Sequence, residues 1–575
     1  MKILLTAINA KYIHSNLAVY SLKAAAEKYS DNIILGEYTI NNSKDYILEK
    51  IYIQRPDVLC FSCYIWNIEY VKEIAKEFHK ICPFVPIWVG GPEVSYEVDA
   101  FLEENTYITG IMTGEGEETF KELMEYYIEG KGQLSKIKGL AYKDEKTNEI
   151  VTTGSREIVD MSKLRFCYDT TKDFSNRIIY YESSRGCPFS CSYCLSSVDK
   201  SLRFRDVNLV KKELKFFIDQ KVPQVKFVDR TFNCNHNHAM EIWKFIKEND
   251  NGVTNFHFEI SADLINEEEL DIISDMRPGL IQLEIGVQST NEATIKEIHR
   301  TMKLERLKEV VKAIQKNGNI HEHLDLIAGL PYESYDIFKK SFDEIYALKP
   351  NQLQLGFLKV LKGSYMYNHA NEYGICYHDK PPYEVLYTNW LSYDEVLKIK
   401  RVEEMLEVYY NSGQFEITIK LLELMFESPF EMFQSLGDFY HKKGYFDLSH
   451  SRLRRCEIIL EFINENGLSE YEELIKESLI FDLYYRENCK TRPKWACDMA
   501  LFKKTTRHYC KNGKLSHVEP FHYRFPDKNI KTISKLPERL DDKVWVLFHY
   551  DKKDPLDNQA MTEYVTDVKE NGHND

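Results

Sequence analysis

The sequence lacks any run of about 18 or more apolar residues, so no segment is expected to span a membrane. It also lacks a signal peptide pattern, because the short apolar run in MKILLTAINAKYIHSN passes directly into polar residues and is typical of a buried strand. The thirteen cysteines follow no regular framework, which argues against a secreted disulfide scaffold. A net charge of −15 argues against a general nucleic-acid binder. We therefore expect a cytoplasmic protein in a reducing compartment, where thiolates can bind metal.

The chain of 575 residues is longer than one hydrophobic core usually supports, so several domains are expected. Residues 1–150 alternate apolar runs such as KILLTAIN, NIILGEYT, DVLCFSCYIW and VPIWVGGPE with segments of helical periodicity. This alternation predicts an α/β domain with a doubly wound, flavodoxin- or Rossmann-like parallel sheet. The polar stretch KDEKTNEIVTTGSREI predicts a hairpin and a linker, which we place at residues 151–176.

A second alternating series occupies residues 177–362. Its strand candidates are IIYYES, QVKFVD, FHFEIS, IQLEIGVQ, HLDLIAGL and LQLGFLKV. Six such units predict a partial (β/α)6 TIM-like barrel, whose functional groups lie at the carboxyl ends of the strands. Residues 363–550 predict a mainly helical C-terminal domain with one late strand, KVWVLFHY, and residues 551–575 predict a disordered tail.

Three thiols, those of Cys187, Cys191 and Cys194, lie in the loop that follows the first strand of the second series. A structural zinc site requires four ligands, so a zinc site would need a remote fourth cysteine such as Cys167 or Cys234. A [4Fe–4S] cluster with one open iron needs only three thiolates. The open iron could chelate the amino and carboxylate groups of S-adenosylmethionine, and one electron would then cleave a C–S bond.

The loop, with Tyr193 before its last cysteine, resembles the CxxxCxΦC motif of the radical S-adenosylmethionine (radical SAM) enzymes. The later segments FVDRTFN, FEIS, IGVQS, EIHR and DLIAGLP resemble those that hold S-adenosylmethionine in oxygen-independent coproporphyrinogen oxidases and their relatives. Carboxylates suit the ribose hydroxyls and the amino group, and an arginine suits the methionine carboxylate. By this resemblance the residues that bind S-adenosylmethionine are Asp229, Thr231, Glu259, Gln288, Arg300 and Asp325.

The ordered loops of the first domain resemble those of cobalamin-binding domains that precede many radical SAM enzymes. The resemblance implies that cobalamin is bound by Ser62, Gly90, Gly91 and Glu115. The DxHxxG motif that supplies a cobalt ligand elsewhere is missing, so Tyr64, Trp66 or water is left for the lower face of the corrin. We expect His14 to be a loop or hydrogen-bonding residue.

The resemblance, which covers about residues 1–360, implies a cobalamin-dependent radical SAM enzyme that acts on an unactivated carbon, with methyl transfer as the leading reaction. The alternatives are a non-methylating radical cyclase or rearrangement enzyme, and a non-enzymatic cobalamin or metal carrier or sensor. We expect an electron donor such as flavodoxin or ferredoxin and a small-molecule or peptide substrate. The C-terminal region resembles an uncharacterised extension found on one branch of these proteins. The spacing of Cys456, Cys489, Cys497 and Cys510 matches no known ligand pattern.

Overall fold

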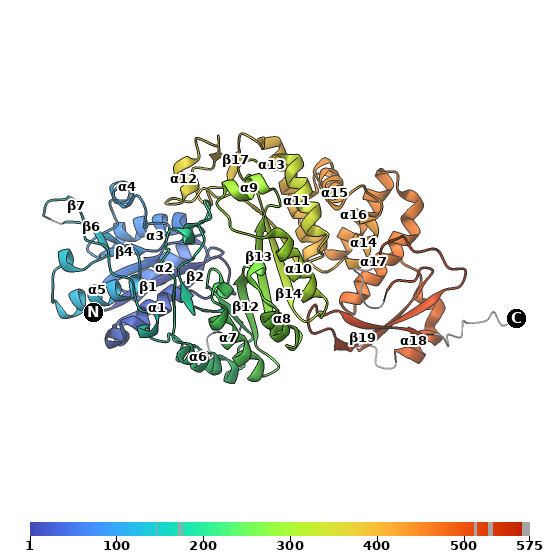
Figure 1. Cartoon of the computed structure of the whole chain (residues 1–575), viewed down its shortest axis with the longest axis horizontal. Coiled ribbons are helices and arrows are strands. Elements are labelled where there is room, and N and C mark those ends of the chain that lie inside the picture. Colours follow the sequence, from blue (N-terminus) through green and yellow to red (C-terminus); the bar gives the residue numbers. More distant parts are fainter. Residues whose placement is uncertain (145, 171–173, 175, 511–514, 527–532, 566–575) are drawn as a thin grey trace. The chain divides into compact units, whose positions relative to one another are not determined.

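The computed structural model describes residues 1–144, 146–170, 174, 176–510, 515–526 and 533–565 (Figure 1). The chain divides into two compact units. The first unit contains Met1–Gly286, Ala293–Asn317 and Phe357–Asn389, and the second contains Val287–Glu292, Gly318–Gly356 and Trp390–Asp575. These limits differ from the predicted domain boundaries at 150, 176, 362 and 550, which stay predictions.

The N-terminal part of the first unit is a seven-stranded sheet of order β2-β1-β3-β4-β5-β6-β7. Its strands are β1 (Ile3–Asn9), β2 (Ile33–Thr39), β3 (Val58–Ser62), β4 (Ile87–Gly90), β5 (Gly110–Met112), β6 (Leu140–Lys143) and β7 (Ile150–Thr152). Its helices are α1 (Leu17–Ala25), α2 (Lys44–Gln54), α3 (Ile68–Ile81), α4 (Val98–Glu104) and α5 (Gly116–Glu129). The pairs among β1 to β5 are parallel, whereas β6 and β7 form the predicted antiparallel hairpin. The predicted doubly wound fold is confirmed.

Apolar residues cover both faces of this sheet. Helix α3 presents Ile68, Val71, Ile74 and Phe78 at helical spacing, and these side chains pack with residues of α2 and α4 in one core. The opposite core contains residues of α1 and α5, including Val19. The carboxyl ends of the parallel strands are therefore left at one edge of the sheet, where ligands bind in folds of this kind.

The second sheet has six strands in the order β15-β14-β13-β12-β11-β8, and the neighbouring pairs from β8 to β13 are parallel. The strands of this sheet that begin in the first unit are β8 (Ile179–Tyr181), β11 (Gln224–Phe227), β12 (Asn255–Ile260) and β13 (Ile281–Gln288). The helices in this part of the chain are α6 (Val207–Asp219), α7 (His236–Glu248), α8 (Glu267–Ser274), α9 (Glu292–Glu297), α10 (Leu304–Gln315) and α12 (Tyr365–His369). The remaining short strands are β9 (Ser184–Arg185), β10 (Arg203–Phe204), β16 (Cys376–Tyr377) and β17 (Val385–Tyr387). All six predicted strands are present. Burial alternates along β13, so every second side chain faces the apolar core and the others face the opposite side.

The second unit contains the two remaining strands of that sheet, a set of helices and a small antiparallel sheet of order β18-β19-β20. Its elements are β14 (His321–Ala328), α11 (Tyr335–Tyr346), β15 (Gln352–Phe357), α13 (Tyr393–Leu406), the π-helix η8 (Glu407–Asn411), α14 (Glu416–Glu423), α15 (Pro429–Lys443), α16 (Arg452–Glu465), α17 (Glu472–Arg486), α18 (Lys503–Tyr509), β18 (Ser516–Phe521), β19 (Val544–Lys553) and β20 (Ala560–Val565). The region is mainly helical, as predicted.

The prediction of a disordered tail from residue 551 is wrong for its first part. Strand β19 continues to Lys553, and β20 pairs with it in antiparallel register from Trp545↔Val565 onward. The alternating segment AMTEYV buries Ala560 against this sheet, which the polar composition of the tail obscured. Residues 566–575 lie outside the described part of the chain. No helix among the described residues is both long and apolar enough to cross a membrane.

Candidate functional site

The three-cysteine loop begins directly after the first strand of the second sheet and is closed by backbone contacts. The amide of Cys187 donates to the carbonyl oxygen of Asp199 at 3.0 Å, and that of Cys194 donates to Cys191 at 3.2 Å. Gly186 has a φ of +92°, and a Cβ there would lie 2.7 Å from the carbonyl oxygen of Ser201. A glycine is therefore required at this turn. Cys187 and Cys191 are buried, and Cys194 is half-buried.

Asp229, at the end of β11, holds the segment that leads into the loop. Its carboxylate accepts hydrogen bonds from the amide of Ser183 at 2.9 Å and from the hydroxyls of Ser183 and Ser184, each at 2.6 Å. Burial raises its pKa to about 6 in spite of these donors. The resemblance implied that Asp229 binds the amino group of S-adenosylmethionine. In the structure its carboxylate instead fixes Ser183 and Ser184. The hydroxyl of Thr231 interacts with the Cys187 thiol.

Arg300 lies beside the cysteine loop, and only some of the N–H donors of its guanidinium group have hydrogen-bond partners. Its Nη1 donates to the hydroxyl oxygen of Tyr193 at 3.2 Å and to Sγ of Cys191 at 3.7 Å, and Nη2 donates to the carbonyl oxygen of Gly286. The Nε atom is buried and has no hydrogen-bond partner. A buried unpaired donor on a guanidinium is costly, so this geometry fits an anionic ligand beside Cys191.

A second group of charged residues lies on the side of the sheet that faces away from the β13 core residues. Nζ of Lys226 lies 2.9 Å from Glu284 and 3.8 Å from Glu259, and Nε2 of His257 lies 3.0 Å from Glu284. Burial opposes ionisation of Glu284, but the contacts with His257 and Lys226 lower its pKa to about 2. Glu259, which the resemblance assigned to S-adenosylmethionine, therefore already has a cation nearby.

The other two predicted S-adenosylmethionine ligands, Gln288 and Asp325, belong to the second unit. Gln288 has a φ of +74°, which is strained for a residue other than glycine, and its buried Oε1 has no hydrogen-bond partner. Oδ1 of Asp325 lies 3.1 Å from Nε2 of His323. Because the six predicted residues fall in two units, their joint role stays a prediction.

Glu333, in the second unit, was missed by the sequence analysis. It is buried and accepts hydrogen bonds from Ser289 at 2.5 Å and from Ser341 at 3.3 Å, and burial raises its pKa to about 8. These contacts fix the residue that follows Gln288. The sequence feature that could have identified Glu333 is its position two residues after the turn Gly329-Leu330-Pro331.

A single tetrahedral zinc ion would hold its ligands close together. Sulfur ligands of a tetrahedral zinc lie about 3.8 Å apart, given Zn–S bonds of about 2.3 Å. Among the described residues, the group of potential metal ligands whose donor atoms all lie within 4.8 Å of one another is Glu473, Glu477 and His522, and not the three cysteines. In the acidic group, Glu473 is already paired with Arg539, and Glu477 and His522 contact each other.

The predicted cobalamin loops lie at the carboxyl ends of β3 and β4. The amide of Cys63 donates to the carbonyl oxygen of Gly90 at 2.7 Å, which joins the two loops. Gly91 has a φ of +120°, and a Cβ there would lie 2.4 Å from the carbonyl oxygen of Cys63. The glycine at 91 is thus required by the protein's own backbone. At Gly90 an added Cβ would be 3.3 Å from the nearest atom, the carbonyl oxygen of Met112. A substitution at Gly90 therefore disturbs the protein's own backbone less than one at Gly91, and it is the better test of whether cobalamin binds at these loops.

Asn67, which the sequence analysis did not single out, shapes the loop after Ser62. Its Nδ2 donates to the carbonyl oxygens of Ser62 at 2.9 Å and Ile8 at 3.0 Å, and its Oδ1 accepts from the amide of Tyr64 at 2.8 Å. The rings of Tyr64 and Trp66 are stacked 4.5 Å apart at 5°. This flat aromatic surface at the loop is consistent with either residue covering a corrin face.

Two further predicted residues connect the first domain to the rest of the first unit. Glu115 forms ion pairs with Arg185 at 3.0 Å and with Arg203, and accepts from the amide of Val159 at 2.8 Å. Its carboxylate is thus occupied by protein, which offers a structural role in place of the predicted cobalamin contact. His14 makes a 2.6 Å hydrogen bond with the hydroxyl of Tyr180, so its expected hydrogen-bonding role is confirmed.

Family models match three successive parts of the chain. Residues 181–345 match the radical SAM superfamily, residues 3–124 match the B12 binding domain, and residues 371–537 match a protein region of unknown function, DUF4080. The chain therefore contains a radical SAM domain. It combines the radical SAM domain with a B12 binding domain and a DUF4080 region, as the resemblance implied. This composition implies a [4Fe–4S] cluster, S-adenosylmethionine and cobalamin as its cofactors.

Two curated relatives share less than 30% of their residues with this chain. The anaerobic magnesium-protoporphyrin IX monomethyl ester cyclase of Rubrivivax gelatinosus is 22% identical over 55% of this chain and 58% of its own length. The cobalamin-dependent radical SAM methyltransferase TokK of Streptomyces tokunonensis is 25% identical over 50% of this chain and 44% of its own length. The chain thus spans about half the length of these curated relatives.

A solved structure extends the likeness in fold. The cobalamin-dependent S-adenosylmethionine radical enzyme OxsB, with aqua-cobalamin bound, superposes with a TM-score of 0.57 at 17% identity. The match covers 84% of this chain and 81% of that chain. At this identity the likeness concerns the fold alone.

Proposed function

We propose that this chain is a cobalamin-dependent radical SAM enzyme that cleaves S-adenosylmethionine reductively and transfers a methyl group to an unactivated carbon. The observation that carries the proposal is the buried guanidinium of Arg300 beside Cys191, with its Nε unpaired. The methionine carboxylate of S-adenosylmethionine would supply the missing acceptor through a charge-assisted hydrogen bond.

The cysteine loop would hold the cluster through Cys187, Cys191 and Cys194. When bound, the cluster supplies the electron that breaks a C–S bond of S-adenosylmethionine, and cobalamin supplies the methyl group. The protein's part is to bind and orient these groups and to exclude water. Asp229 fixes the start of the loop through Ser183, and Arg300 fixes its middle.

The cobalamin side of the proposal rests on the loops after β3 and β4. The joined backbones at Cys63 and Gly90 leave a strand end without a side chain at position 90, where the nucleotide tail would approach. The stacked Tyr64 and Trp66 would cover the lower face of the corrin in place of a histidine ligand. His14 is engaged by Tyr180 and has no proposed part in coordination.

A second candidate function is a radical cyclisation or rearrangement that uses the same cofactors without methyl transfer. It is favoured by the likeness to the magnesium-protoporphyrin ester cyclases. Both candidates require an electron donor such as flavodoxin or ferredoxin and a small-molecule or peptide substrate.

The products of S-adenosylmethionine separate these candidates. Anaerobically reconstituted protein, given a reductant, cobalamin and S-adenosylmethionine, should release 5′-deoxyadenosine, and the Cys191→Ala variant should release none. Methyl transfer should in addition produce S-adenosylhomocysteine and move a deuterated methyl label into the product. Release of 5′-deoxyadenosine without S-adenosylhomocysteine in the presence of cell extract would favour the cyclase reaction. Absence of both products with a fully loaded cluster would reject both enzymatic candidates.

A further inference from the structure

Residues 358–389, which we call the bridge, leave the second unit after β15 and pack within the first unit before the chain returns to α13 (Figure 1). The bridge contains α12 and the short strands β16 and β17. The DUF4080 match begins within it, at residue 371. Connections longer than about 12–15 residues with little regular structure are uncommon in compact domains and are usually functional.

The bridge contacts the segment that follows the proposed cobalamin turn at the end of β4. The hydroxyl of Tyr383 donates to Oε1 of Glu93. Nζ of Lys362 lies 2.9 Å from Glu97, and the hydroxyl of Tyr367 donates to the same carboxylate at 2.8 Å. Hydrogen bonds from these two side chains lower the pKa of Glu97. Because Glu97 is exposed to water and Tyr383 is buried, the contact of Tyr383 should contribute most to this attachment.

Close packing reinforces this attachment. Gly363 has a φ of +85°, and a Cβ added there would overlap the ring of Tyr96. Glycine is therefore required at position 363 both by the backbone conformation and by the neighbouring ring. Tyr96 lies between the two glutamates that the bridge contacts, so the whole segment after the turn is held.

The bridge also contacts the cysteine loop. The amide of Met366, in α12, donates to the carbonyl oxygen of Ser192 at 2.9 Å, and both residues are buried. Ser192 lies between Cys191 and Tyr193, the two side chains of the loop that accept hydrogen bonds from Arg300. The contact therefore fixes the middle of the loop.

Further contacts hold the segment that precedes Arg300. The hydroxyl of Tyr373 donates to Glu297 at 2.8 Å. The rings of Tyr365 and His299 meet edge to face, with their centroids 4.9 Å apart. His299 has a φ of +54°, in the left-handed region, and directly precedes Arg300. The bridge thus supports the backbone that places the guanidinium beside the cysteine loop.

The bridge has buried residues of its own. Met366, Tyr373, Ile375, Tyr383 and Val385 are all buried. A close-packed segment is hardly compressible and transmits a displacement from one end to the other. The contacts with the proposed cobalamin turn and those with the cysteine loop are therefore mechanically connected.

We propose that the bridge fixes the cysteine loop and Arg300 relative to the loops after β3 and β4, and so sets the separation of the two cofactors. The connection itself rests on the contacts above, whereas its effect on the cofactors rests on the proposed function. A displacement of about 1 Å between reacting groups can cost about a hundredfold in rate, so their spacing has to be held. The start of the DUF4080 region, residues 371–389, thereby acquires a positioning role.

Hydrogen–deuterium exchange of the full-length protein without cofactors tests the connection. Tyr383→Phe removes the hydroxyl that binds Glu93 and keeps the ring. Exchange should rise by about two- to tenfold, the factor for one lost hydrogen bond, at residues 91–98 and also at residues 188–195 across the bridge. A contact with only a local role would raise exchange at residues 91–98 alone.

The reciprocal variant and a matched control complete this experiment. Tyr373→Phe removes the hydroxyl that binds Glu297, and it should raise exchange at residues 91–98 as well as near Glu297. Tyr387→Phe makes the same change at an exposed position of β17, where the hydroxyl contacts Cys376 of the bridge itself, and should alter neither segment. Exchange that is unchanged in both test variants, or raised only where each variant makes its contact, would overturn the proposal.

Electron paramagnetic resonance of the protein reconstituted with cluster and cobalamin tests the spacing. Magnetic interaction between the reduced cluster and cob(II)alamin should broaden the wild-type spectrum. Gly363→Ala, which displaces Tyr96, should change this broadening at unchanged iron and cobalamin content, as should the milder Tyr383→Phe. Gly130→Ala is the control, because Gly130 has a φ of +64° and an added Cβ meets no atom of the described residues within 4 Å.

The outcomes of the two experiments separate the bridge from the proposed function. A spectrum that is identical in the wild type and in both bridge variants would overturn the role in cofactor spacing. A protein that takes up neither cofactor would reject the proposed function, and the exchange experiment would still decide whether the bridge connects the two regions.

Discussion

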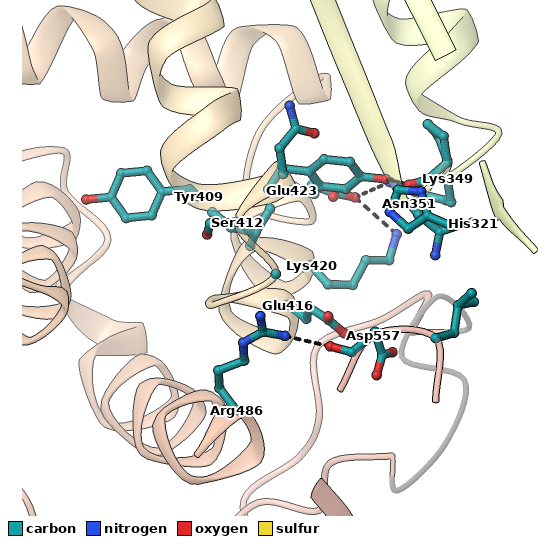
Figure 2. A pocket seen from close by; sticks show the side chains of 16 residues that line it. His321, Lys349, Asn351, Tyr409, Ser412, Glu416, Lys420, Glu423, Arg486 and Asp557 are labelled. Carbon is teal, nitrogen blue, oxygen red and sulfur yellow. Dashed lines mark hydrogen bonds and ion pairs between the residues drawn. The ribbon is translucent and has the colours of Figure 1, made fainter. Parts of the chain in front are cut away.

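The cysteine loop and a cavity of the second unit, here called the C-terminal cavity, are both charged, yet their charges are balanced in different ways. The charged residues that line this cavity of about 330 Å³ include Lys349, Glu416, Lys420, Glu423, Arg486 and Asp557 (Figure 2). At the loop, Arg300 donates to a thiol, a phenol hydroxyl and a backbone carbonyl group, and none of these three partners is a carboxylate. In the cavity, the cations Lys349 and Lys420 already share the carboxylate of Glu423. The loop is therefore incomplete without its cofactors, whereas the cavity is nearly neutral by itself.

This difference teaches what to expect when each region is altered. An incomplete site depends on every group that binds the missing ligand, because no neighbour can replace a lost thiolate or guanidinium. A site with internal ion pairs can redistribute its contacts, so single changes there should have graded effects. The predictions below test this contrast, from the largest expected effect to the smallest.

The largest effect is expected from the cluster ligands. Cys187→Ala, Cys191→Ala and Cys194→Ala should each abolish the oxygen-labile cluster, which in the wild type should contain about four irons. Iron analysis and the visible absorption spectrum after anaerobic reconstitution measure this loss. Cys234→Ala is the matched control, because that half-buried cysteine is, with Cys167, one of the remote thiols that a zinc site could have used. Loss of bound metal in Cys234→Ala, or stoichiometric zinc without iron in the wild type, would contradict the assignment.

The same contrast explains how much the sequence could predict. The three cysteines lie within eight residues, so their ligand spacing is visible in the sequence, and the alternating strands predicted both sheets. Asp229 was recognised as a site residue, but its contacts with Ser183 and Ser184 depend on how β8 and β11 pair. The cavity could not be predicted, because its residues come from six segments between residues 321 and 557. The charged residues among them, taken alone, resemble ordinary surface charges.

Arg300 should give the next largest effect. Arg300→Ala should weaken S-adenosylmethionine binding by about ten- to a hundredfold, which corresponds to a charge-assisted contact of about 1.5–3 kcal/mol. Equilibrium binding measured on the reconstituted protein gives the change, and the cluster spectrum should persist. Arg306→Ala is the control, because Arg306 pairs with Glu267 on the same unit, away from the loop. Equal affinity in Arg300→Ala and the wild type would remove Arg300 from the binding site.

A smaller effect is expected at the cobalamin loops. Gly90→Val should lower the affinity for cobalamin by about tenfold or more, because the added side chain would press against Met112 and shift the end of β4, where the cofactor is proposed to bind. Gly36→Val is sterically matched, since an added Cβ at Gly36 also meets its nearest atom at 3.3 Å, but Gly36 lies within β2. Cobalamin retention after gel filtration, measured by absorbance, compares the two. Similar retention in both variants would place the cofactor elsewhere in the domain.

The smallest effect concerns Glu416 and the dependence of stability on pH. The folded-state pKa of Glu416 is raised from 4.5 to about 8, so the protein is stabilised by the neutral acid. This contribution is fully present below the unfolded-state pKa and is lost as the pH rises through 8. Glu416→Gln imitates the neutral acid at every pH, so its melting temperature should match that of the wild type near pH 5. It should exceed that of the wild type by about 2–4 °C at pH 9. Glu427→Gln, at an exposed position, should show a difference that does not change with pH. A Glu416→Gln difference that is constant from pH 5 to pH 9, or that favours the wild type at pH 9, would show that Glu416 is ionised in the folded protein.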